Sequence, residues 1–158
     1  MFTLPLYAGL DYHLKTIQVC VMDSQRKILA NQSVANDPEA VFRIVGVYGS
    51  QVQVAIEAST GVAEFAELLL THYQWTVFLA HPGYVARMKQ TPDKSDWTDA
   101  KLLADLTRAG YIPRVWLAPQ NIRELRELVR HRHGLVQQRR REFFKAFARK
   151  YIKKPFRY

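Results

Sequence analysis

The chain has 158 residues, enough for one ordinary domain with an appended segment, since domains most often contain roughly 100–150 residues. Hydrophobic residues make up 48% of it and charged residues 23%, which excludes a disordered or collagen-like chain. The formal net charge is +9, and residues 121–158 hold thirteen Lys and Arg against three Asp and Glu. Such a basic block is typical of a surface that binds nucleic acid, and it also fits a solvated helix face.

Targeting signals and disulfides are not expected. No apolar run is long enough to cross a membrane, and the start of the chain lacks the basic and apolar regions of a signal peptide. The only cysteine, Cys20, lies in an alternating apolar run. We therefore expect no disulfide within the chain, no membrane partner and a cytoplasmic location.

The first third of the chain predicts mainly strands. Three β-rich runs with short polar links, over residues 4–11, 16–23 and 27–35, predict an antiparallel meander. Asp37 and Pro38 then indicate the start of a helix that continues to about Tyr48 and stops at Gly49. The next alternating run, residues 51–58, predicts a buried strand.

The second part of the chain predicts mainly helices. A helix from Val62, a strand, a short helix, a loop, a helix closed by Gly110 and an extended segment follow in order. The first helix begins at Val62, and the strand spans residues 75–80. The short helix spans residues 82–89, the loop 90–94, the next helix 96–109 and the extended segment 111–117. Residues 119–150 predict one long amphipathic helix, or two helices broken near Gly134. Arg132 and Arg139 occupy heptad positions that are normally apolar in a coiled coil, so the apolar seam is imperfect. Two alternatives stay open: a coiled-coil homodimer, and packing of the helix onto the domain.

The order βββαβαβα, with three antiparallel strands followed by helix-linked strands, is that of the ribonuclease H fold. We therefore expect an α/β domain with a mixed sheet over residues 1–117 and a basic helical extension over residues 118–158. An actin-like nucleotide-binding domain shares this sheet order. It needs glycine-rich phosphate loops, and the segment after Asp11 contains no glycine.

Four carboxylates fall where this fold would bring them together. Asp11 ends the first strand, Glu57 ends the fourth, and Asp96 and Asp99 lie in the first turn of a helix. Residues three apart share a helix face, so both aspartates would face the ends of the strands. Such a cluster suits two Mg²⁺ or Mn²⁺ ions, which prefer oxygen ligands and promote phosphodiester chemistry.

The three aspartates also have plain structural explanations, whereas Glu57 does not. Asp96 or Asp99 could cap a helix, and Asp11 could simply end a strand. Glu57 follows an apolar run, where an acid needs a partner. His13 could contact a phosphate near the metal ions or pack at the strand end.

Four separated motifs, in order, resemble the DEDD transposases of bacterial insertion sequences and the related Piv-type DNA invertases. They are GLDYH at residues 9–13 with Lys15, EASTG at 57–61, KSDWTDA at 94–100, and LREL at 125–128 with Arg130 and Arg132. The resemblance implies a RuvC-like amino-terminal domain whose metal ligands and catalytic residues are Asp11, Glu57, Asp96 and Asp99. It implies DNA strand cleavage and transfer at the bacterial nucleoid, guided by a structured RNA.

The resemblance and the basic tail together suggest which residues contact nucleic acid. These are Lys94, Arg130, Arg132, Arg139, Arg140, Arg141, Lys145, Arg149 and Lys150. Members of the family normally carry a further domain with a nucleophilic serine, which this sequence lacks, so we expect a catalytic domain that is incomplete in isolation. The alternative is a non-catalytic module that binds nucleic acid and dimerises.

Overall fold

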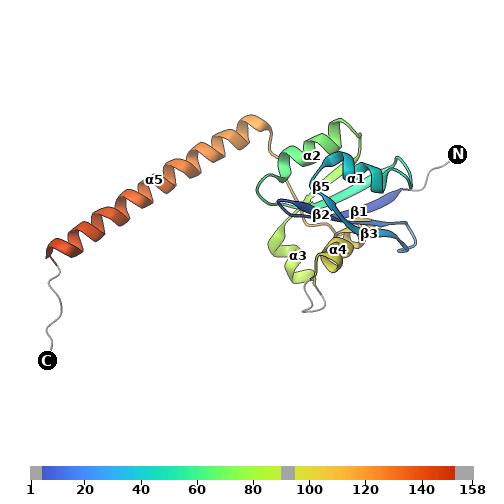
Figure 1. The fold of residues 1–158 in the computed structure, drawn as a ribbon, viewed down its shortest axis with the longest axis horizontal. Coiled ribbons are helices and arrows are strands. Elements are labelled where there is room, and N and C mark those ends of the chain that lie inside the picture. The colour runs from blue at the N-terminus through green and yellow to red at the C-terminus, as the bar shows by residue number, and fades with distance from the viewer. Residues whose placement is uncertain (1–4, 90–94, 152–158) are drawn as a thin grey trace, which may run out of the picture. The chain divides into compact units, whose positions relative to one another are not determined.

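The computed structural model of the chain describes residues 5–89 and 95–151 (Figure 1). The predicted loop over residues 90–94 therefore lies outside the described residues. The chain divides into two compact units, Met1–Leu117 and Ala118–Tyr158.

A mixed sheet forms the centre of the first unit, and its strands lie in the order β3-β2-β1-β4-β5-β6. β1, β2 and β3 form the predicted antiparallel meander, whereas β1, β4 and β5 run parallel. β6 is the part of the predicted extended segment that pairs, antiparallel, with β5. The bounds are β1 Leu6–Tyr12, β2 Thr16–Met22, β3 Ile28–Ala35, β4 Val52–Glu57, β5 Thr76–Ala80 and β6 Arg114–Val115.

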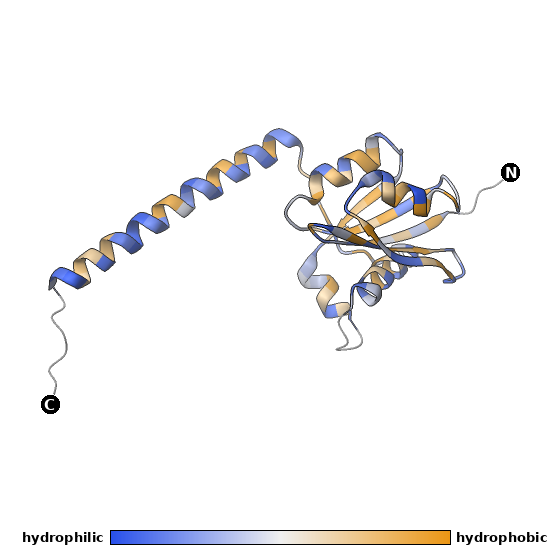
Figure 2. Ribbon diagram, in the orientation of Figure 1, coloured by the Kyte–Doolittle hydropathy of each residue, from blue (hydrophilic) through white to orange (hydrophobic). Residues whose placement is uncertain are grey.

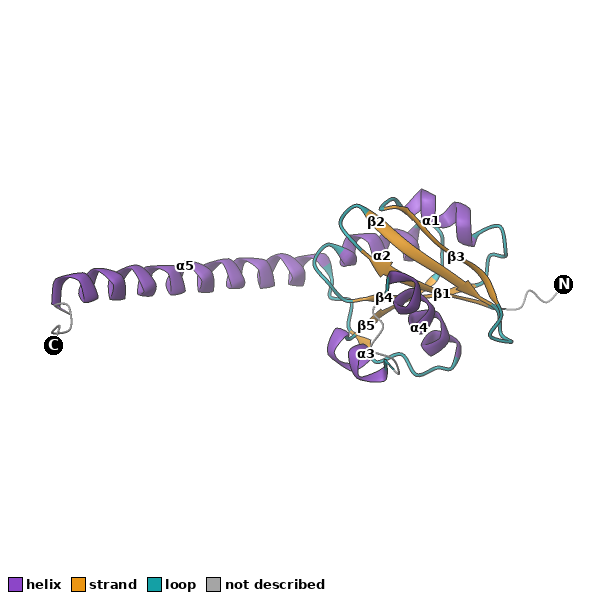
Figure 3. Ribbon diagram, turned by 60° about the horizontal axis from the view of Figure 1, so that its bottom comes forward, coloured by secondary structure: helices purple, strands orange, loops and turns teal. Residues whose placement is uncertain are grey.

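Helices cover both faces of this sheet (Figures 1 and 3). On one face, α1 (Pro38–Val45) and α2 (Val62–Thr71) enclose the larger apolar core. On the other face, α3 (Pro82–Met88) and α4 (Asp96–Arg108) pack over smaller clusters. Side chains of β2 are buried on both faces, because the strand lies inside the sheet with a layer on either side.

The helix α1 is shorter than the sequence predicts. It ends at Val45 with Gly46 as its C-cap, rather than near Tyr48 and Gly49. The Tyr48 hydroxyl donates a hydrogen bond to the Leu29 carbonyl, 3.0 Å away, so this residue reaches toward β3. Gly46, a poor helix former, thus ends the helix one turn earlier than the pattern predicts.

Strand order and direction together confirm the predicted ribonuclease H-like fold. An antiparallel meander supplies one half of the sheet, and helix-linked parallel strands extend it from β1. This arrangement places the carboxyl ends of β1 and β4 side by side. Such an edge is where ligands bind in open α/β sheets.

The second unit contains a single described helix, α5 (Gln120–Tyr151), of 32 residues. It continues through Gly134, so the predicted alternative of a break there is wrong. Glycine inside a helix costs only about 1 kcal/mol relative to alanine, which a helix of this length tolerates. Across the described parts of the chain, no helix combines the length and the apolar character needed to traverse a bilayer.

Candidate metal centre

Gly9 allows helix α4 to lie directly against strand β1. A methyl group at this position would lie 2.0 Å from the carbonyl oxygen of Ala100 and 2.5 Å from the backbone nitrogen of Ala104. Both atoms belong to the backbone of α4, so they could not yield as a side chain would. The missing side chain of Gly9 therefore sets how closely the helix approaches the strand.

Asp11 and Glu57 lie at the ends of neighbouring parallel strands. The β1–β4 register pairs Gly9 with Ala55, and it continues to the next residue on each strand. Side chains alternate along a strand, so Asp11 shares the face of Gly9, and Glu57 shares the face of Ala55. That is the face covered by α4, because Ala55 packs in a cluster with residues of α3 and α4. Both acids thus lie at strand ends on the face of the sheet that α3 and α4 cover.

Ser95 caps helix α4 and frees the aspartates of its first turn from that role. The Ser95 hydroxyl accepts a hydrogen bond from the Thr98 backbone N–H, and the Thr98 hydroxyl accepts one from the Ser95 N–H, each at 3.2 Å. This reciprocal pair is a capping box. Asp96 therefore does not cap the helix, and it lies one turn before the buried Ala100 that faces the sheet.

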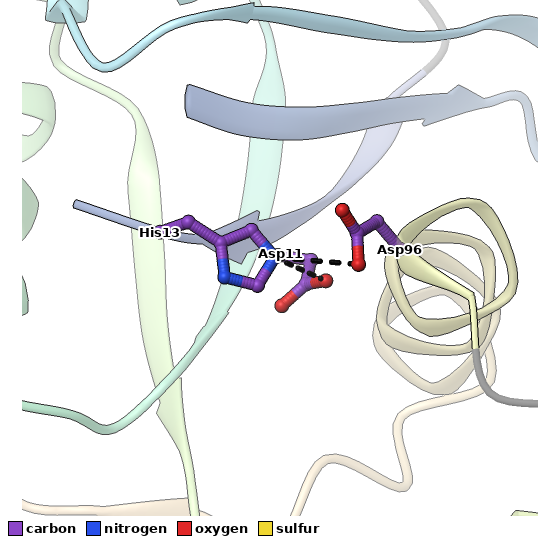
Figure 4. A group of neighbouring side chains, drawn as sticks. All are labelled: Asp11, His13 and Asp96. Carbon is purple, nitrogen blue, oxygen red and sulfur yellow. Dashed lines mark hydrogen bonds and ion pairs between the residues drawn. The ribbon is translucent and has the colours of Figure 1, made fainter. Parts of the chain in front are cut away.

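Asp11, His13 and Asp96 form a compact group at this point (Figure 4). The Nε2 atom of His13 lies 3.1 Å from an Asp11 oxygen and 3.4 Å from an Asp96 oxygen. One ligand atom from each residue lies within 4.8 Å of the other two. The imidazole thus bridges an acid at a strand end and an acid at a helix start.

Burial shapes the electrostatics of Asp11. Its side chain is 16% exposed, whereas that of Asp96 is 64% exposed. Burial raises the pKa of the Asp11 carboxyl above its ordinary value. The nearby His13 opposes that shift, and the negative charges of Asp96 and Asp99 add to it. Negative charge is therefore crowded at Asp11, which a bound cation would relieve.

Asp99 forms an ion pair with a lysine, and its predicted role as a metal ligand stays a prediction. The Lys89 ammonium lies 2.7 Å from each of its two carboxylate oxygens. Lys89 directly follows α3, and the sequence analysis does not identify it as a site residue. In the described parts of the chain, Asp99 lies outside the close group of Asp11, His13 and Asp96. Its negative charge nevertheless helps to raise the pKa of Asp11.

The donor chemistry of the group fits a divalent cation. Two carboxylates offer the hard oxygen ligands that Mg²⁺ and Mn²⁺ prefer, and an imidazole nitrogen suits Mn²⁺ better than Mg²⁺. Glu57, at the end of the adjacent strand, lies outside this close group, and it takes part in another interaction within the protein. The closeness of the three ligand atoms is the observation that supports this fit.

The predicted nucleic-acid contacts lie elsewhere in the chain. Lys94 is outside the described residues. The remaining eight all belong to α5, on which no residue is buried. They are Arg130, Arg132, Arg139, Arg140, Arg141, Lys145, Arg149 and Lys150.

Comparison with known proteins places this chain in a family. A structure of T. thermophilus RuvC in complex with a Holliday junction substrate matches 70% of this chain and 99% of its own, with 15% sequence identity and a TM-score of 0.46. No curated protein matches the sequence. The model of an IS110-type DEDD family, described as a transposase, matches residues 8–146, which is most of the chain. The chain therefore belongs to the IS110-type DEDD transposase family.

Proposed function

We propose that this chain is the amino-terminal catalytic domain of a DNA transposase that cleaves and transfers DNA strands. The observation that carries the proposal is the grouping of Asp11, His13 and Asp96 where the end of β1 meets the start of α4. Membership of the transposase family supplies the class of reaction. Such a protein would act on DNA at the bacterial nucleoid, in the cytoplasm.

The centre would bind Mg²⁺ or Mn²⁺ through Asp11 and Asp96, with Glu57 and Asp99 as the other two acids of the predicted site. A bound ion of this kind activates an attacking oxygen or stabilises a leaving one in phosphodiester chemistry. Gly9 keeps Asp96 near Asp11 by allowing α4 to lie on β1. His13 holds the two carboxylates in place through its bridging contacts.

Helix α5 would bind the nucleic-acid backbone. Its Arg and Lys side chains offer salt-dependent contacts that do not depend on sequence. Replacing Arg139, Arg140 and Arg141 with alanine should weaken DNA binding and flatten its salt dependence, by about 0.9 in logarithmic slope for each phosphate that the helix no longer neutralises. Gel-shift titrations at several salt concentrations, with DNA and with structured RNA, test this interaction and the proposed RNA partner separately.

We also propose a homodimer through α5. Leu125, Val129, Phe143 and Phe147 recur on the helix, and all four side chains are exposed. Figure 2 shows hydrophobic positions recurring between hydrophilic ones along α5. The rings of Phe143 and Phe147 stack with centroids 6.4 Å apart, so these two residues form one apolar patch on the helix. Analytical ultracentrifugation should show that Phe147→Glu lowers the dimer fraction, whereas Phe144→Glu, about a quarter-turn round the helix from Phe143, lowers it less.

One experiment separates catalysis from a non-catalytic binding module. Binding of Mn²⁺ should be lost in an Asp11→Asn/Asp96→Asn variant and retained in Glu39→Gln. Glu39 is a suitable control because it is an exposed acid that pairs only with Arg43 on the same helix, 3.5 Å away, among the described residues. Calorimetric titration with Mn²⁺ should show binding to the wild type and not to the double variant. Equal, negligible binding in both would favour the module.

A further inference from the structure

Arg114 lies in the same row of the sheet as Glu57. Glu57 pairs with Ala80 across β4 and β5, and Ala80 pairs with Arg114 across β5 and β6. Side chains paired in this way point to the same face of a sheet. Ala80 packs in the apolar cluster with residues of α3 and α4, so this is the face on which Asp11 and Glu57 lie. An exposed arginine and the two strand-end acids thus share one edge and one face.

An aromatic ring holds the guanidinium of Arg114 in place. The central carbon of the guanidinium lies 3.9 Å from the centroid of the Phe78 ring. A planar guanidinium at this distance is attracted to the face of the ring and stacks on it. Phe78 itself packs against the cluster under α3 and α4. The contact uses the face of the guanidinium, so the N–H donors in its plane are left for another acceptor.

The charge of Arg114 also differs in its environment from that of other arginines in the first unit. Arg26 lies 2.8 Å from a carboxylate oxygen of Asp105, and Arg43 lies 3.5 Å from one of Glu39. Among the residues that the structure describes, Arg114 forms no such ion pair, and its contact is with a neutral ring. Its positive charge is therefore available to an anion that comes from outside the chain.

We infer that Arg114 is a positioning residue, which binds a backbone phosphate of the DNA strand whose reacting phosphate lies at the metal centre. This inference rests on the proposed function, because it concerns how the substrate of the same centre is held. Two strand spacings separate Arg114 from Glu57, so their Cα atoms lie about 10 Å apart. An arginine fork can donate two parallel hydrogen bonds to one phosphate. Arg114 would thus fix one phosphate while the ion acts on another phosphate of the same strand.

Binding of short single-stranded DNA to the full chain tests the inference, with fluorescence anisotropy as the readout. In Mn²⁺, Arg114→Met should weaken binding roughly tenfold, because it removes a charged hydrogen-bond donor. The logarithmic salt slope should fall by about 0.7, the value for one phosphate of a single strand. In EDTA the loss of affinity should be smaller, since the ion no longer holds the strand beside Arg114.

Two further variants separate a phosphate contact from a structural effect. Arg114→Lys keeps the charge and should keep most of the salt slope, although it loses the stacked, two-pronged geometry. Arg43→Met is the matched control, because Arg43 is an exposed arginine of α1, on the other face of the sheet. It should leave both the affinity and the slope unchanged. Circular dichroism spectra should show that all three variants are folded.

The outcomes distinguish this inference from the proposed function. An unchanged slope in Arg114→Met, or an equal fall in Arg43→Met, would overturn the inference, and so would equal losses of affinity in Mn²⁺ and in EDTA. The proposed function would stand in each of these cases, provided that the wild type binds Mn²⁺. A wild type that binds no Mn²⁺ would overturn the proposed function and the inference with it. A loss seen with RNA of the same sequence and not with DNA would also overturn the inference, because the strand at this edge would then be RNA.

Discussion

Replacement of Gly9 by alanine should separate α4 from β1 and disrupt the centre. The added methyl carbon would lie 2.0 Å and 2.5 Å from two backbone atoms of α4, whereas ordinary contacts begin at 3.4 Å. The helix would have to withdraw by about 1.4 Å to bring the 2.0 Å contact to 3.4 Å, which weakens the dispersion contacts of Ala100, Leu103 and Ala104. Overpacking of this kind costs about 1–3 kcal/mol, and a backbone-to-backbone overlap belongs at the upper end.

Thermal unfolding followed by circular dichroism measures this effect. For a unit of this size, a loss of about 3 kcal/mol lowers Tm by roughly 10 °C. Gly83→Ala is the matched control in the same unit, because the nearest atom to its new methyl group is a carbon of the His81 ring, 3.3 Å away, which can shift. The Gly9 variant should also bind Mn²⁺ more weakly. A Tm equal to that of Gly83→Ala would refute the close packing of α4 on β1.

Three further predictions concern charge, reactivity and the helix start. In metal-free buffer, Asp11→Asn should raise Tm at neutral pH. Because burial raises the folded-state pKa of Asp11, this carboxyl favours the fold when protonated and that contribution is lost as pH rises through its pKa, so the gain should vanish in acid. Melting curves against pH in EDTA would check this, and equal Tm values at neutral pH would contradict it. The Cys20 thiol, whose pKa burial raises to about 11, should resist alkylation at pH 8 until urea unfolds the chain, as mass spectrometry would show. Labelling at the same rate without urea would mean that Cys20 is accessible. Ser95→Ala should lower the unfolding free energy by about 1 kcal/mol in urea titrations, because it removes the cap of α4; an unchanged midpoint would show that the cap contributes nothing.

The fold was largely predictable because its signals are local. Alternation of apolar residues indicates the strands, and Asp37 with Pro38 indicates the start of α1. The end of α1 was misplaced, because the helix stops at Gly46, an earlier glycine than the Gly49 that the prediction uses. The continuity of α5 through Gly134 depends on a small energy difference that sequence pattern does not resolve.

The centre was less predictable than the fold. Strand order brings Asp11 and Glu57 to neighbouring strand ends, and this follows from the topology. The contact of His13 with Asp11 could have been predicted from the sequence, because residues two apart in an extended chain lie on the same side. The contact of Lys89 with Asp99 could not be predicted from the sequence, since it joins the end of one helix to the start of another across a loop.

Diffraction from a crystal soaked in Mn²⁺, measured at a wavelength where manganese scatters anomalously, tests the central claim most directly. The account predicts an anomalous peak within bonding distance of carboxylate oxygens of both Asp11 and Asp96. A map with no peak between Asp11 and Asp96, or with manganese bound only elsewhere on the chain, would contradict it.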